Sequence, residues 1–142
     1  MKEMQVMNNV SPDARNALIS GGTSGIGLAL AQGFAAAGYN VIAAGLGPLP
    51  HSTPSIRFAR LDVTDGPAVA ALVSELPELD VVVNAAGIIR REDEFDPDIF
   101  AQVIDINLNG TMRICTAARA ALAKRNGSII NIASMLSYFG GG

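Results

Sequence analysis

Short apolar runs alternate along this chain with longer segments of helical periodicity. Each run is only a few residues long and ends at glycine or at a polar side chain, which is the pattern of a buried strand. The predicted strands are residues 17–20, 41–44, 56–61, 80–84 and 128–134. The β-branched run before Asn84 indicates burial on both faces of the sheet.

The segments between these strands are rich in Ala and Leu at helical spacing. The first expected helix covers residues 25–37 and ends at Gly38, and the second is capped by Thr64 or Asp65. A third helix is expected to start at Pro97. The last is expected to begin at Asn107 or Asn109 and to end at Asn126 and Gly127. The apolar face of the last helix is expected to carry Met112, Cys115, Ala118, Ala121 and Leu122. Residues 45–55 hold several Gly and Pro and predict a loop.

Strands that alternate with helices are expected to join by right-handed crossovers into a parallel sheet with helices on both faces. We therefore predict an α/β fold of the Rossmann type, doubly wound, with about five strands in the order 3-2-1-4-5. Residues 1–13 read as a flexible tail and residues 14–142 as one domain. In this architecture, ligands bind at the carboxyl ends of the strands, where the strand order reverses.

Composition narrows the class of protein. Apolar residues make up 49% and charged residues 16%, so the chain can bury a core. The net charge of −3, with scattered basic residues, argues against a nucleic-acid partner. The single Cys115 fits a reducing compartment and argues against a Cys-based metal site. With neither a secretory signal nor a membrane-spanning run recognised, a cytoplasmic location is expected, with no membrane partner.

A glycine-rich turn follows the first predicted strand. Gly21, Gly25 and Gly27 form a G-x-x-x-G-x-G pattern between that strand and a helix. Glycines allow a tight turn, let a pyrophosphate approach bare backbone, and let the helix pack close to the sheet. The N–H groups at the start of the helix can bind phosphate oxygens. The alternative is a glycine-rich turn with no ligand.

The turn and four later motifs together resemble the short-chain dehydrogenase/reductase family. The later motifs are Leu61-Asp62-Val63, Asn84-Ala85-Ala86-Gly87, Asp105-Ile106-Asn107 and Ile132-Ala133-Ser134. Ser20 stands where the family has Thr, and Ala85 replaces the second Asn of an Asn-Asn-Ala-Gly motif. The resemblance covers residues 17 to about 134.

The resemblance implies an NAD(P)-dependent oxidoreductase that transfers hydride between nicotinamide and an alcohol or carbonyl substrate. It implies cofactor binding by Gly21, Thr23, Ser24, Gly25, Ile26, Gly27, Gly45, Asp62, Val63, Asn84, Ala85, Ala86 and Gly87. It also implies that Ser134 positions the substrate oxygen, that Asn107 holds a relay water, and that the protein is a homo-oligomer.

Several of these residues also have simpler interpretations. Asp62 could cap the turn into the next helix, and Asn84 could be a strand-end turn residue. Asn107 could be the N-cap of a helix that begins at Leu108. Ser134 could be an ordinary strand-end hydroxyl. Cys115 reads as inert core.

The choice between NAD and NADP depends on the end of the second strand. An acidic residue there hydrogen-bonds the ribose 2′-hydroxyl of NAD, whereas an Arg pairs with the 2′-phosphate of NADP. Residues 44–47 carry no charge, and Gly45 leaves room for a phosphate. Arg57, Arg60 or His51 could reach such a phosphate, but no base follows Gly45 directly, so the sequence leans to NAD.

The family's Tyr-x-x-x-Lys motif does not follow Ser134. Only Tyr138 lies downstream, and no Lys follows Lys124. Without a cation beside it, a phenol titrates too high for general-base catalysis near neutral pH. We therefore expect a C-terminally incomplete domain whose later strands are missing and whose catalytic competence is not full. The alternative is a non-catalytic dinucleotide-binding or dimerisation fragment, paired through small residues at Ala117, Ala120 and Ala121.

Overall fold

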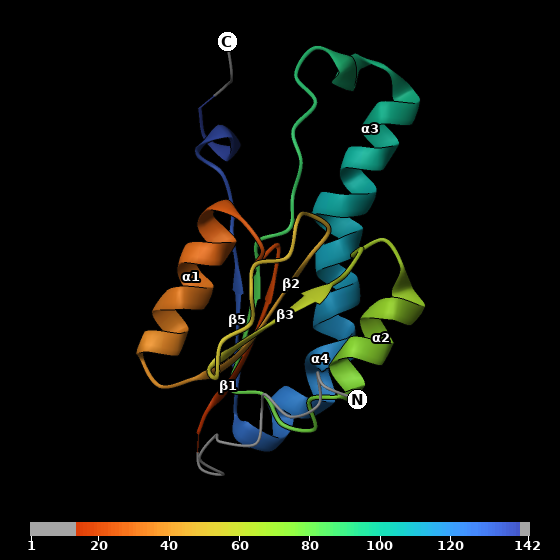
Figure 1. Ribbon diagram of the computed structural model, residues 1–142. Coiled ribbons are helices and arrows are strands. Elements are labelled where there is room, and N and C mark those ends of the chain that lie inside the picture. Colours follow the sequence, from red (N-terminus) through yellow and green to blue (C-terminus); the bar gives the residue numbers. More distant parts are fainter. Residues whose placement is uncertain (1–13, 140–142) are drawn as a thin grey trace.

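The computed structural model describes residues 14–139, and the tail predicted for residues 1–13 lies outside the described part. Five strands form one parallel sheet in the order β3-β2-β1-β4-β5, which confirms the predicted topology (Figure 1). The strands are β1 (Asn16–Ser20), β2 (Asn40–Gly45), β3 (Ile56–Arg60), β4 (Val81–Asn84) and β5 (Ser128–Asn131).

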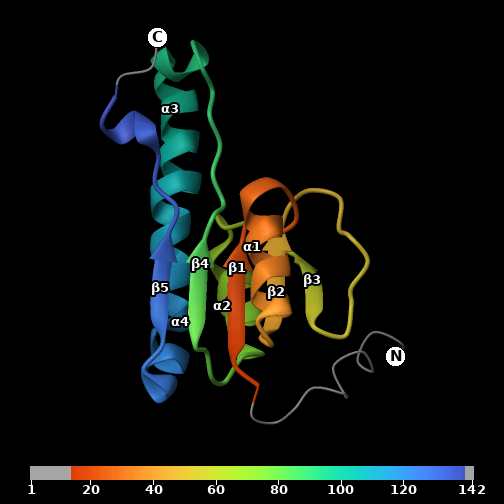
Figure 2. The same ribbon diagram turned by 90° about the vertical axis from the view of Figure 1, so that its left-hand side faces the viewer.

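Helices cover both faces of the sheet. The longer helices are α1 (Gly25–Ala36), α2 (Gly66–Ser74), α3 (Pro97–Ile104) and α4 (Thr111–Arg125). The short helical segments are η2 (Asp93–Phe95), the π-helical turn η3 (Asp105–Gly110) and η4 (Met135–Ser137). Figure 2 shows α1 in front of the sheet and α2 and α4 behind it, with α3 rising past the carboxyl ends of the strands.

The sheet separates two layers of core. Leu18, Ile42 and Val82 pack toward α2 and α4, while their chain neighbours Ile19 and Val83 pack toward α1. Successive strand residues point to opposite faces, so the continuous apolar runs of β1, β2 and β4 are buried on both sides. The sequence prediction of a doubly covered sheet is therefore confirmed.

The long C-terminal helix corrects three predictions. The chain does not restart at Asn107 or Asn109, because α3, η3 and α4 follow one another without a break. Asn107 therefore caps no helix, and it lies inside the π-helical turn. Within α4, Met112 is 65% exposed, whereas Ile114 is fully buried. A π turn contains more residues than an α turn, so the residues that follow it are rotated about the helix axis. Ile114 therefore faces the sheet at the place where a regular 3.6-residue period would put Met112.

Other positions on α4 also differ from expectation. Cys115 is only half-buried rather than fully in the core. Ala121 is buried in the core beneath α4, and Ala117 packs against that core, so neither is an outer position for pairing as proposed from sequence. Ala120 is exposed. The helix ends where predicted, at Asn126, which takes the left-handed conformation with φ of 50°.

The strand β5 is shorter and more exposed than expected. It ends at Asn131 rather than at Ser134. Its apolar side chains Ile129 and Ile130 are 43% and 42% exposed, because β5 is the edge of the described sheet. Ile130 is paired with Val83 on the α1 face, and α1 does not reach β5 (Figure 2).

The contact between Gly27 and Gly21 sets how closely α1 approaches β1. A Cβ atom on Gly27 would fall on the carbonyl oxygen of Gly21, whereas one on Gly33, in the same helix, would meet nothing within 4 Å. We predict that Gly27→Ala lowers the free energy of unfolding by about 1–3 kcal/mol through overpacking. The matched control Gly33→Ala is expected to raise it by about 0.4–1 kcal/mol. Urea denaturation measures both, and equal effects would contradict the close contact.

Candidate functional site

The carboxyl ends of β1, β2 and β4 meet at one edge of the sheet, where α1 also begins (Figure 1). Two main-chain hydrogen bonds join the segments that leave these strands. Gly22 N–H donates to the Ala44 carbonyl at 3.0 Å, and Ala85 N–H donates to the Ser20 carbonyl at 3.0 Å. The glycine turn is therefore attached on both sides, to β2 and to the segment after β4.

The three glycines of the turn have different surroundings. Gly21 has φ of 69°, and a Cβ there would lie 2.6 Å from the main chain of Ala85. Gly27 packs on Gly21 as described above. Gly25, at the start of α1, faces open space. These surroundings match the three roles expected of the glycines, namely a tight turn, close helix packing, and access for a ligand to the backbone.

The start of α1 is open to an anion. Ser24 lies at the N-cap in extended conformation, but its side chain makes no capping hydrogen bond. The first N–H groups of a helix have no partner within the helix and carry the positive end of its dipole. With open space at Gly25, these groups fit the pyrophosphate of a dinucleotide.

Thr23 lies beside the end of β2. It is only 7% exposed, and a Cβ on Gly45 would come within 2.5 Å of its hydroxyl oxygen. Thr23 thus occupies the space that a side chain at position 45 would need.

Asn84 connects the ends of three strands. It is 4% exposed, accepts a 3.5 Å hydrogen bond from the Ser20 hydroxyl, and donates to Asn131 Oδ1 at 2.9 Å and to Cys115 Sγ at 3.4 Å. These bonds run from β4 to β1, to β5 and to α4. Asn84 therefore stabilises the strand ends next to the segment of Ala85, Ala86 and Gly87, of which only Gly87 is exposed.

Asn107 holds the segment after β4 from the other side. Its Oδ1 accepts from Ile88 N–H at 2.8 Å, and its Nδ2 donates to the Ile88 carbonyl at 2.9 Å. The amide thus pairs with both main-chain groups of one residue, and a Cβ on Gly87 would lie 3.4 Å from its Oδ1. Asn107 lies in the π turn, and its side chain is directed at the segment after β4 rather than along the helix.

Asp62 and Val63 follow β3 and pack near the same π turn. Asp62 Oδ1 accepts from the N–H and hydroxyl of Thr64 at 2.9 and 2.7 Å, so it does close the turn toward α2. The N-cap of α2 itself is Asp65, which accepts from Ala68 N–H at 2.9 Å. The local role proposed for Asp62 is therefore confirmed, although it does not cap the helix.

Arg113 joins the Asp62–Val63 segment to the π turn. Its guanidinium donates to the Val63 carbonyl at 3.4 Å and to Asp105 Oδ1 at 2.7 Å. Hydrogen bonds from Arg113, and then from Asn109, hold the pKa of the Asp105 carboxyl below its ordinary value. Asp105 therefore stays ionised and keeps its ion pair with Arg113 near neutral pH.

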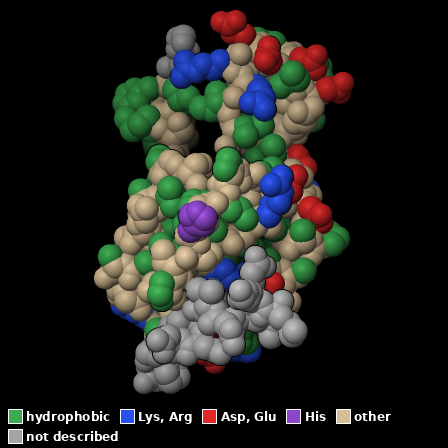
Figure 3. Space-filling view, viewed as in Figure 1, with side chains coloured by type: hydrophobic (Ala, Val, Ile, Leu, Met, Phe, Trp, Pro, Cys, Tyr) green, Lys and Arg blue, Asp and Glu red, His purple; other side chains and the backbone are tan. Residues whose placement is uncertain are grey.

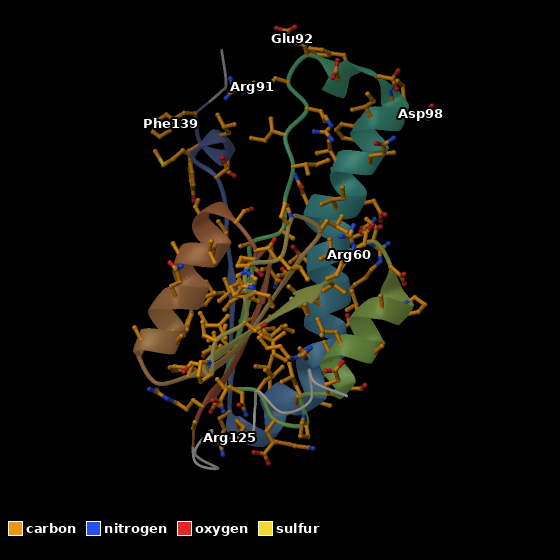
Figure 4. The ribbon with its side chains drawn as sticks, in the orientation of Figure 1. Arg60, Arg91, Glu92, Asp98, Arg125 and Phe139 are labelled. Carbon is orange, nitrogen blue, oxygen red and sulfur yellow. The ribbon has the colours of Figure 1, made fainter. Side chains whose placement is uncertain are left out.

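Ser134 lies outside these contacts. It is exposed, and its hydroxyl accepts from Leu136 N–H at 3.1 Å at the start of η4. Figure 3 shows an open cleft above the carboxyl ends of the strands, between the C-terminal segment and the α3 region. In Figure 4, Glu92 and Asp98 lie at the far end of the α3 region, as expected for a solvated loop, whereas the Arg91 side chain extends toward the C-terminal segment that carries Phe139.

The structure thus brings most predicted site residues together at one edge. The glycine turn contacts Ala85 and Ala86, Thr23 contacts Gly45, and Asn107 contacts the segment after β4. Sequence reasoning missed Arg113, Ile88 and Asn131. Asn131 had a signal, since it is a polar residue in an apolar strand, but Ile88 and Arg113 act through long-range contacts that no spacing reveals.

Two surface hollows lie away from this edge. One is next to Arg15 and Tyr39, near the end of α1, and the other runs between α4 and Ile129. Neither contains the converging main-chain groups found at the glycine turn. Among residues 14–139, no helix is long and apolar enough to cross a membrane, and no three potential metal ligands cluster.

Comparison with known proteins identifies the family. Residues 15–141 match the family model described as short chain dehydrogenase. The chain is 34% identical to 2-dehydro-3-deoxy-D-gluconate 5-dehydrogenase of Dickeya dadantii (strain 3937), over 96% of this chain and 60% of that protein. It is 33% identical to 3beta-hydroxysteroid dehydrogenase of Mediterraneibacter gnavus, over 90% of this chain and 52% of that protein.

Solved structures agree with the sequence relatives. An actinorhodin polyketide ketoreductase crystallised with NADPH superposes with a TM-score of 0.81 at 26% identity, over 93% of this chain and 57% of that one. The chain thus spans little more than half the length of the relatives it matches. With its sheet order and its glycine turn, the chain belongs to the short chain dehydrogenase family.

Proposed function

We propose that this chain forms the cofactor-binding part of an NAD(P)-dependent oxidoreductase that interconverts an alcohol and a carbonyl compound. The observation that carries the proposal is the open start of α1, with uncapped N–H groups and free space at Gly25, directly beside the carboxyl ends of β1 and β4. Members of the family bind NAD(P), and a bound nicotinamide cofactor supplies or accepts the hydride.

Each site residue then has a specific task. The backbone from Ser24 to Gly27 holds the pyrophosphate, and Asp62 with Val63 holds the adenine. The segment of Ala85, Ala86 and Gly87, fixed by Asn84 from below and by Asn107 from the side, positions the nicotinamide half. Because Asn107 is bound to Ile88 through both amide atoms, its side chain acts as a positioning group for this segment.

Substrate positioning falls to the cleft near Ser134. The Ser134 hydroxyl accepts from Leu136 N–H and retains its own proton for donation to a substrate oxygen. A proton donor for the alkoxide is not evident in residues 126–142, since Tyr138 is 86% exposed and no Lys lies among them.

We predict that Gly25→Asp weakens dinucleotide binding, with Gly25→Asn as the matched control. Asp and Asn both tolerate positive φ, and the space at Gly25 is open, so both variants should fold. The carboxylate would repel the pyrophosphate and occupy the helix N-terminus, which favours an anion. Calorimetric titration with NADPH and NADH should show binding at least about tenfold weaker for Asp than for Asn. Equal affinities for wild type and Gly25→Asp would contradict the proposed site.

We also predict that the 142 residues bind the cofactor but do not oxidise or reduce a substrate at an appreciable rate. The physical reason is that general acid–base catalysis needs a positioned proton-transfer group, whereas Tyr138 is 86% exposed and no Lys follows Lys124 in this sequence. Absorbance at 340 nm with a panel of alcohols and carbonyl compounds measures the rate. Steady turnover by the wild type that is lost in Gly25→Asp would contradict this prediction. It would show that Ser134 and Asn107 suffice for catalysis without the Tyr and Lys.

A further inference from the structure

The end of β2 and its neighbour in β3 indicate which cofactor this site prefers. We infer that the site binds NADP more tightly than NAD, with Arg60 and Thr23 recognising the 2′-phosphate across the bare backbone of Gly45. The inference rests on the proposed function and adds the chemistry of the adenosine ribose. It reverses the preference that the uncharged residues 44–47 suggested.

Gly45 removes the group that selects NAD. An acidic side chain at the end of β2 would hydrogen-bond the ribose 2′-hydroxyl and repel a 2′-phosphate. At Gly45, even a Cβ would come within 2.5 Å of the Thr23 hydroxyl oxygen. The place of the acid is therefore taken by a neutral hydroxyl that can donate a hydrogen bond to phosphate.

The Thr23 hydroxyl lacks a protein partner within residues 14–139. The residue as a whole is only 7% exposed, yet the structure contains no buried side-chain oxygen or nitrogen that is unpaired in this range. The Thr23 oxygen must therefore reach the surface, and it lies beside the Cβ position of Gly45 at the end of β2. A nearly buried side chain whose unpaired polar atom remains accessible is well placed for a ligand.

Arg60 projects from the same face of the sheet as this hydroxyl. It is paired with Gly45 in the register of β2 and β3, and the Cβ direction of Gly45 points at Thr23. Arg57 supports this orientation of Arg60 independently. It forms a 2.6 Å ion pair with Glu75 at the end of α2, so its side chain lies on the α2 face of the sheet. Three residues along a strand reverse the face, so Arg60 points away from α2.

The Arg60 guanidinium has no ion-pair partner among the described residues. Residues 45–60 contain two Arg and no Asp or Glu. Among the described side chains, no carboxylate lies within 4 Å of the Arg60 guanidinium. The next acid along the chain, Asp62, is engaged by Thr64. Figure 4 shows Arg60 at the carboxyl end of β3, the end on which the cofactor site lies. A guanidinium matches the geometry of phosphate oxygens.

The test compares the dissociation constants of NADPH and NADH for wild type, Arg60→Gln, Thr23→Val and the control Arg57→Gln. Wild type should bind NADPH more tightly than NADH. Arg60→Gln should weaken NADPH binding by about 10- to 100-fold, the range for a hydrogen bond to a charged group, with NADH binding nearly unchanged. Thr23→Val should have a smaller effect in the same direction.

The control separates a local contact from general loss of positive charge. Arg57→Gln removes the same charge from the same strand on the opposite face, so the NADPH-to-NADH ratio should stay close to that of wild type. Tighter binding of NADH by wild type, or equal effects of Arg60→Gln on both cofactors, would overturn the inference while leaving the proposed function intact. Failure of folded wild type to bind either cofactor would overturn both.

Discussion

The main chain at Gly27 lies so close to Gly21 that no side chain fits between them, and this contact determines the geometry of the whole site. Because α1 packs directly on the turn after β1, its first N–H groups point at the edge where β2 and β4 also end. Gly21 in turn packs against the main chain of Ala85. The turn, the helix start and the segment after β4 thus form one continuous surface.

Two amides maintain the other half of this surface. Asn84 is buried and connects three strands and α4, whereas Asn107 is exposed and pairs with both main-chain groups of Ile88. Buried polar groups are costly unless they are paired, so Asn84 favours one arrangement of the strand ends. The π turn enables the second contact, because it directs Asn107 toward β4 while α3 and α4 continue as one helix. Arg113 then joins this turn to Val63 on the adenine side.

The sequence predicted those features that depend on local chemistry. The Pro97 helix start, the Asp65 cap and the end of α4 at Asn126 each depend on neighbouring residues, and they were found as expected. The strand order is not local, but it followed from the alternation of strands with helices. The π turn could not be predicted, since one helical period was assumed from Asn107 to Asn126. That assumption placed Met112 in the core instead of Ile114 and made Asn107 a candidate N-cap. The partners of Asn107 and Arg113 lie 19 and 50 residues away, beyond any local pattern.

The account's central claim is that a dinucleotide lies across the carboxyl ends of β1, β2 and β4, over the start of α1. The most direct measurement is the change in backbone amide chemical shifts when NADPH is added to the isotopically labelled protein. We expect the shifts to concentrate in residues 21–28, 45–47, 62–63 and 85–88. Shifts confined to the hollow beside Arg15 and Tyr39, or to the groove between α4 and β5, would contradict the account, as would no shifts at all.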